Sequence, residues 1–257
     1  MGNHYEYQSL ENINMQGILN KYVDLIDTFE LVTEYCPWKE CTDENPYGVY
    51  KVSSEDGKRA IEILEKHFKD YHLKNYNQIP EEIKKNLPDF QALYYEIEAE
   101  TKKHASKTED ELKESNESPF LCDEVGNGKT KYNNPKKFFW GMYHDMGFLL
   151  DCSKRIEALM KNSIVRPLDF ELNNDQNSAL KPYLVSITPT FTWHCTTSSC
   201  FSKVFRFKLT DEAKKWLLQF ETDYDIEGFE DLALYNGDKL LFSSCTHEGF
   251  HFDVINK

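Results

Sequence analysis

Apolar and polar residues alternate with a period of two in the last third of the chain. The alternation runs through residues 183–188, 190–195 and 203–209, and returns at 250–254. Successive side chains of a strand point to opposite faces, so each segment has one mostly apolar and one mostly polar side. Asn236-Gly237-Asp238, between two further apolar segments, is typical of a β-hairpin turn. The pattern predicts an antiparallel sheet whose apolar face is covered by helices.

Helical spacing of apolar residues dominates the first half of the chain. Between residue 10 and about residue 35, positions that include Leu25, Phe29 and Val32 fall on one face of a helix. Cys36-Pro37 marks the expected end of this helix, because the residue before a proline resists the α conformation. The spacing predicts a long amphipathic helix over 10–35.

Five sequence signals predict the starts of later helices. Ser53-Ser54 precedes two acidic residues and is a candidate N-cap. Pro80 and Pro88 indicate two more starts, since proline is tolerated in a first helical turn. Asn134-Pro135 opens the longest apolar stripe of the chain, and Thr210 precedes Asp and Glu as a further N-cap.

These elements predict the α+β class, with a largely helical N-terminal half packed on a mostly antiparallel β-sheet formed by the C-terminal third. Residues 1–104 form the expected helical region, and residues 135–257 combine one helix with the sheet. Residues 105–134 are rich in Lys, Glu, Ser and Asn, so a mobile loop or linker is expected there. The alternative is one continuous domain over 1–257, a length compatible with both arrangements.

Composition and charge narrow the classes of partner. The formal net charge of −14 argues against nucleic acid and anionic membranes and favours a basic protein partner. A secretory leader and a run of about 18–20 apolar residues are not seen, so a soluble, cytoplasmic protein is expected. Seven scattered cysteines, an odd number, are typical of free thiols in a reducing compartment.

Residues 221–231 form the most acidic stretch of the chain and contain no Lys or Arg. This stretch is the candidate surface for a basic partner, and the alternative is a solvated acidic turn between a helix and a strand. Asp223-x-Asp225-x-Glu227-Gly228 also matches the first half of a calcium-binding EF-hand loop, but the twelfth position is Leu234 instead of Glu. The candidate binding residues are Glu221, Asp223, Asp225, Glu227, Glu230 and Asp231, together with Arg206 of a predicted strand.

Two cysteine-containing segments have spacings that suit zinc. They are Cys195-x4-Cys200 and Cys245-x-His247-x3-His251, and thiolate and imidazole are common zinc ligands. Cys195 shares a predicted face with apolar residues, where a free cysteine packs as a small hydrophobic side chain. Cys245 and His247 are therefore the candidate zinc ligands, with ordinary structural cysteines as the alternative.

The polar side of the predicted sheet carries residues suited to acid–base chemistry. His194, His251 and Asp253 are the candidate catalytic residues, because histidine with a carboxylate is the usual material of proton transfer. Arg206 on the same side would bind an anionic group. The alternative is the ordinary solvated face of an antiparallel sheet.

Two functions follow as expectations. The first is an acidic cytosolic binding protein that engages a basic protein, for instance an immunity-type neutraliser of a nucleic-acid-cleaving toxin. The alternative is a hydrolase, metal-dependent or using His/Asp acid–base chemistry, with its site on the C-terminal sheet. The positions of the C-terminal histidines distinguish the two functions: convergence in a concave site would favour an enzyme, and dispersal over a flat surface would favour a binding protein.

Overall fold

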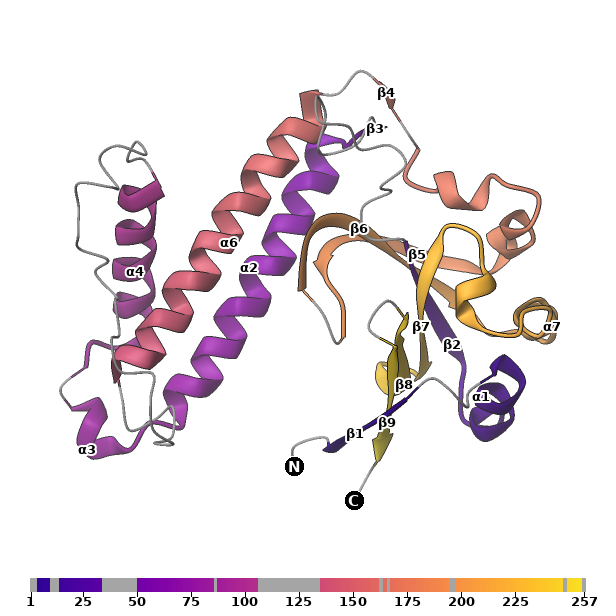
Figure 1. Cartoon of the computed structure of the whole chain (residues 1–257), viewed down its shortest axis with the longest axis horizontal. Helices are drawn as coiled ribbons and strands as arrows, with labels where there is room; N and C mark the ends of the chain where they lie inside the picture. The colour runs from indigo at the N-terminus through magenta and orange to yellow at the C-terminus, as the bar shows by residue number, and fades with distance from the viewer. Residues whose placement is uncertain are drawn as a thin grey trace. The chain divides into compact units, whose positions relative to one another are not determined.

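The computed structural model describes residues 4–9, 14–33, 50–85, 87–105, 135–161, 164–165, 167–194, 197–246 and 249–255. The chain divides into two compact units, Met1–Ala60 with Ile156–Lys257, and Ile61–Arg155 (Figure 1). The predicted α+β class is confirmed, with helices mainly in the N-terminal half and an antiparallel sheet largely from the C-terminal third. Residues 106–134 of the expected linker lie outside the described residues.

The first unit is built on a seven-stranded sheet with the strand order β1-β9-β8-β7-β2-β6-β5, and each neighbouring pair is antiparallel. Gly237, in the predicted hairpin turn between β7 and β8, has φ +57, a backbone conformation that glycine adopts without steric cost. The strands are β1 (His4–Ser9), β2 (Thr28–Thr33), β5 (Leu184–Thr192), β6 (Thr197–Lys208), β7 (Phe229–Asn236), β8 (Lys239–Cys245) and β9 (Phe250–Ile255). A separate parallel pair joins β3 (Tyr50–Lys51) to β4 (Ile164–Val165).

The predicted helix over 10–35 is wrong in its second half. Helix α1 covers Met15–Tyr22, starting after Asn14, whose side chain accepts a hydrogen bond from the Gly17 N–H (2.7 Å). Residues 28–33 instead form β2, an interior strand of the sheet that lies between β7 and β6. The apolar positions of this short segment fit both periods, and pairing on two sides favours the strand over local helical spacing.

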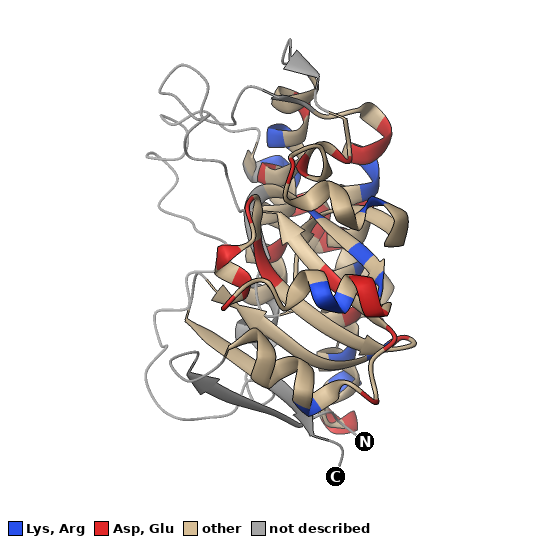
Figure 2. Cartoon of the chain, turned by 90° about the vertical axis from the view of Figure 1, so that its right-hand side faces the viewer, with Lys and Arg blue, Asp and Glu red and all other residues tan. Residues whose placement is uncertain are grey.

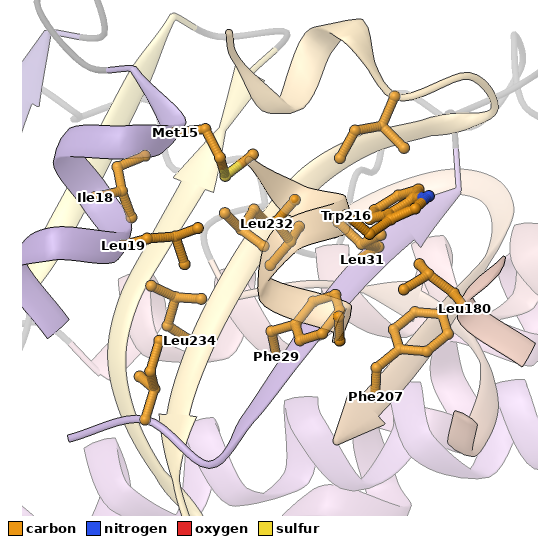
Figure 3. Packing of buried hydrophobic residues seen from close by; sticks show 14 of the residues in the cluster. Met15, Ile18, Leu19, Phe29, Leu31, Leu180, Phe207, Trp216, Leu232 and Leu234 are labelled. Atoms are coloured by element: carbon orange, nitrogen blue, oxygen red, sulfur yellow. The ribbon is translucent and has the colours of Figure 1, made fainter. Parts of the chain in front are cut away.

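The core of the first unit lies on one face of the sheet. Strands β2, β6, β7 and β8 meet α1, α7 (Asp211–Leu217) and the 3₁₀ helices η4 (Phe170–Leu172) and η5 (Asn177–Tyr183) there (Figure 3). Phe29 stacks on Phe207 with ring centroids 5.1 Å apart. Helix α7 begins at the predicted N-cap, where Thr210 Oγ1 accepts a hydrogen bond from the Ala213 N–H (3.2 Å). The apolar face of the sheet is thus covered by helices, as predicted.

The described part of the second unit is helical. Its helices are α2 (Ser54–Asn77), α3 (Glu81–Lys84), α4 (Phe90–Ala105) and α6 (Pro135–Lys161), of which residues 54–60 and 156–161 are assigned to the first unit. The predicted starts are confirmed: Ser53 Oγ accepts a hydrogen bond from the Asp56 N–H (3.0 Å), and α6 begins at Pro135. Tyr94 and Met142 lie at the centre of the apolar core of this unit. Among the described helices, none has the length and apolar character required to cross a bilayer.

Candidate functional site

The face of the sheet opposite the core carries a polar network centred on Tyr235. The Tyr235 hydroxyl donates a hydrogen bond to Glu30 Oε2 (2.7 Å) and also contacts His194 Nε2. A tyrosine hydroxyl has a single hydrogen, so His194 must donate through Nε2 in the second contact. This leaves Nδ1 of His194 as the nitrogen with the free lone pair. The guanidinium of Arg206 lies over the Tyr235 ring, 4.8 Å from its centroid, and 3.8 Å from Glu30 Oε1.

The sheet register and a bend in one hairpin assemble this network, which we call the outer-face network. Glu30 of β2 and Arg206 of β6 are direct partners across the two strands. His194 follows β5, and the neighbouring Trp193 packs on Val32 and Tyr235, so the end of the β5–β6 hairpin lies over the outer face. The β5–β6 pairing shifts register near Thr192, and such irregularities bend a strand (Figure 1).

Burial sets the protonation states of the outer-face network. It lowers the pKa of His194 to about 4 and raises the pKa of Tyr235 well above its usual range. Burial also raises the pKa of Glu30, against the opposing effects of the Tyr235 hydrogen bond and the Arg206 charge. At neutral pH the imidazole is therefore neutral and the phenol keeps its proton. A neutral imidazole oriented through one nitrogen is chemically able to take a proton at the other.

The structure brings together two of the predicted residues and separates a third. His194 and Arg206 meet in the outer-face network, but His251 of β9 is buried on the core face, where its ring stacks on Phe242 at 5.6 Å. Strands β8, β7 and β2 lie between β9 and β6. The side chain of Asp253 is outside the described residues. The carboxylate that approaches His194 is that of Glu30. Sequence reasoning misses this residue because the apolar spacing predicts a helix over 10–35.

The acidic stretch is divided between surface and interior. Glu221, Asp225 and Glu227 are exposed, and Glu230 is half-buried. Asp223 and Asp231 are buried, so they are not available to a partner as the sequence suggested.

The calcium-loop interpretation of Asp223 to Gly228 is wrong. Asp225 Oδ2 accepts hydrogen bonds from the N–H (2.8 Å) and hydroxyl (3.1 Å) of Thr222, which caps the short 3₁₀ helix η6 (Asp223–Asp225). Asp223 turns the other way, and its Oδ2 accepts a hydrogen bond from the Ser244 hydroxyl. Their oxygens therefore do not converge on a common ion, as an EF-hand requires.

The two buried aspartates attach η6 to strands β7 and β8. Asp231 Oδ1 accepts a hydrogen bond from the Thr246 N–H (2.7 Å), and the Thr246 hydroxyl lies 2.8 Å from the same oxygen and 3.3 Å from Asp223 Oδ2. Burial raises the pKa of Asp223, and raises that of Asp231 to about 7. The sequence does not reveal this pair, because a count of charged residues does not distinguish a buried aspartate from an exposed one.

Only some of the candidate zinc ligands lie within the residues that the structure describes. Cys245 is buried, whereas His247 and Cys195 lie outside the described residues, as does the side chain of Cys200. In the second unit, His72 Nε2 lies 2.7 Å from Asp145 Oδ2 and links α2 to α6. Over the described ranges, no group of three or more His, Cys, Asp or Glu side chains is positioned to hold a metal ion.

Within the described residues, the outer-face network and the acidic stretch each bring several reactive or charged side chains close together. No protein-family model, curated protein or solved structure matches this chain.

Proposed function

We propose that this protein binds a basic protein partner through the acidic turn, defined here as residues 221–230. The proposal is carried by one observation: the exposed carboxylates of this turn stand on a backbone that is held from several directions. Glu221, Asp225 and Glu227 point their charge to solvent, and Tyr224 between them is 64% exposed. Tyrosine is enriched among the residues that dominate binding energy at protein interfaces.

Three main-chain contacts hold the acidic turn in addition to its buried aspartates. The Glu221 carbonyl accepts a hydrogen bond from the Met15 N–H of α1 (2.7 Å). The Glu227 N–H donates to Gln176 Oε1 (2.8 Å), and its carbonyl accepts from Asn177 Nδ2 (2.7 Å). A surface ordered before binding loses less conformational entropy when a partner docks. This supports the acidic turn as a recognition surface rather than a solvated loop.

The charge of the turn indicates the class of partner. The stretch 221–231 has no basic residue, within a chain of net charge −14. Elsewhere in the chain acidic and basic residues both occur, and Figure 2 shows red and blue positions together on the described helices and strands of the face that it draws. Complementary charge raises association rates and selects against acidic competitors. An immunity-type neutraliser that covers the positive active site of a nucleic-acid-cleaving toxin is one instance of this function. A reducing compartment such as the cytoplasm fits the odd number of cysteines scattered over the chain.

Charge reversal within the acidic turn tests the proposal. The variant Glu221→Lys/Glu227→Lys changes two exposed carboxylates that do not serve as caps, and Glu62→Lys/Glu96→Lys makes the same charge change on exposed helix positions of the second unit. In pull-downs from lysate of the native host, the wild type and the helix variant are expected to retain a basic protein at low ionic strength. The turn variant is expected to retain at least about tenfold less.

Repeating the pull-down at increasing salt concentration is a second test, because salt screens the attraction between charges at an exposed surface. Recovery by the wild type is expected to fall as salt rises, in parallel with the loss caused by charge reversal. Equal recovery by the turn and helix variants, or failure of the wild type to retain any basic protein, would count against this function.

A second candidate function, acid–base hydrolysis, is supported by the outer-face network. His194 is neutral and held by Tyr235, which is in turn held by Glu30, so a base with a fixed orientation stands over the sheet. If this network is catalytic, His194→Gln is expected to lower turnover of para-nitrophenyl acetate by about 10²-fold or more. His67→Gln, at an exposed histidine of the second unit, is the control. Equal turnover by both variants would exclude a catalytic role for His194.

A further inference from the structure

The hydroxyl of Thr246 has more acceptors around it than its hydrogen can serve. It lies within hydrogen-bonding distance of the Glu230 carbonyl, of Asp231 Oδ1 (2.8 Å) and of Asp223 Oδ2 (3.3 Å). A threonine hydroxyl carries a single hydrogen. If both aspartates were ionised, two of these three oxygens would face the hydroxyl oxygen with no hydrogen between them.

One additional proton removes this conflict. With a hydrogen on Asp231 Oδ1, that carboxyl donates to Thr246 Oγ1, and Thr246 donates to the Glu230 carbonyl. Asp231 Oδ1 still accepts from the Thr246 N–H, and Asp223 Oδ2 is served by the Ser244 hydroxyl. Ser244 Oγ in turn accepts from the Leu232 N–H (2.8 Å). The closest contacts of the cluster then each contain a hydrogen.

The second oxygen of Asp231 independently favours the protonated form. Asp231 is 0% exposed, and its Oδ2 is buried with no hydrogen-bond partner in the part of the chain that the structure describes. An ionised carboxylate in this position would lack compensation for half of its charge, whereas the carbonyl oxygen of a neutral acid loses far less on burial. Among the described residues, neither aspartate forms an ion pair with Lys or Arg. The raised pKa of both carboxyls agrees with this geometry.

We propose that Asp223 and Asp231 hold one proton between them and act as a pH-sensitive latch that fastens the acidic turn to β7 and β8. When the proton leaves for water, the Asp231 O–H bond breaks and two buried carboxylates face each other across Thr246. Asp231 lies within a central strand, but Asp223 lies in the three-residue helix η6, which is the weaker attachment. Loss of the proton therefore releases η6 while the sheet remains intact.

The other titratable groups near the pair lie on β7, β8 and β9. Glu230, adjacent on β7, adds negative charge and disfavours ionisation of Asp231. His251 of β9 pairs in register with Ser244 and stacks on Phe242, and the buried Cys245 follows Ser244 on β8. The latch concerns the conformation of the acidic turn, so it holds or fails whether or not the turn binds a partner.

Carbon-13 NMR of the side-chain carboxyls of the wild type tests the shared proton directly. One aspartate carboxyl signal is expected to titrate near neutral pH, in the presence of a chelator and without a change when calcium is added. Absence of any aspartate titration above about pH 5.5 would overturn the proposal, because an unperturbed aspartate is already ionised there. A titration that calcium abolishes would also overturn it, in favour of a cation held by the two carboxylates.

Amide hydrogen exchange tests the latch. In the wild type, protection of the Ile226 and Phe229 amides, corrected for the intrinsic rate, is expected to fall by up to about tenfold per pH unit above the midpoint. Asp231→Asn or, if that variant does not fold, Asp223→Asn is expected to give protection independent of pH. Glu227→Gln removes an exposed charge from the same turn and should behave as the wild type. Wild-type protection that is flat across neutral pH, or the same slope in the aspartate variant, would refute the latch.

Discussion

Replacing Phe29 by alanine is expected to lower the free energy of unfolding by about 3–5 kcal/mol, the range for loss of a phenyl ring from a packed core. Phe29 is completely buried near the start of β2, and its ring stacks on Phe207 of the neighbouring strand. The adjacent strands β6 and β7 are paired on both sides and cannot close the cavity by simple movement of an edge. Urea denaturation of the two proteins, with equal slopes, measures the difference.

Leu25→Ala is the matched control, because the two competing interpretations of this segment disagree about it. A helix over 10–35 would place Leu25 and Phe29 on one buried stripe, so both substitutions would be costly. In the structure Leu25 is 53% exposed in the turn before β2, and its loss is expected to cost less than about 0.5 kcal/mol. Similar losses for the two variants would contradict the placement of Phe29 in an interior strand and of Leu25 in an exposed turn.

Elements encoded by local chemistry were predictable from the sequence. The Asn236-Gly237-Asp238 turn, the Thr210 cap and the start of α6 at Pro135 all depend on residues within a few positions of one another. The α+β class followed from the same local periods. These signals remain readable because turn and cap preferences depend little on distant parts of the chain.

Features that depend on distant pairing were not predictable in the same way. The Tyr235–Glu30 hydrogen bond joins residues 205 positions apart, and the sequence contains no spacing that links them. Segment 28–33 is too short for its period to distinguish a strand from a helix, and pairing with β6 and β7 decides the outcome. The alternation wrongly predicts that His251 lies beside His194 on the polar side of the sheet, because alternation alone does not give the strand order or the buried face.

The acidic stretch shows the same limit for electrostatics. Asp231 and Glu227 contribute equally to a charge count, yet the first is buried beneath the turn and the second is exposed on it. A buried carboxyl is recognised by its response to pH, since burial penalises the ionised form. The cost of burying Asp231 is therefore visible only at a pH where an aspartate in the unfolded chain is ionised, whereas an exposed carboxylate such as Glu227 has no such cost.

The largest pH effect is expected for Asp231→Asn, whose stability relative to the wild type should increase as the pH rises. The pKa of Asp231 is raised to about 7 in the folded state, against about 3.9 in an unfolded chain. A raised pKa stabilises the fold fully below the unfolded value, and this contribution is lost as the pH rises through the folded value. Between about pH 5 and about pH 8 the wild type is expected to lose on the order of 3 kcal/mol that the variant does not lose.

Comparing two proteins isolates Asp231 from the other perturbed groups. The raised pKa of Glu30 gives a trend of the same sign and the lowered pKa of His194 the opposite one, and both remain in the variant. Asparagine keeps an acceptor for the Thr246 N–H but places a buried N–H₂ where Oδ2 stood, so the variant is expected to be the less stable protein in acid. The two denaturation midpoints should approach or cross as pH rises. A difference that stays constant would mean that Asp231 is ionised throughout, and that the fold tolerates its charge in the interior.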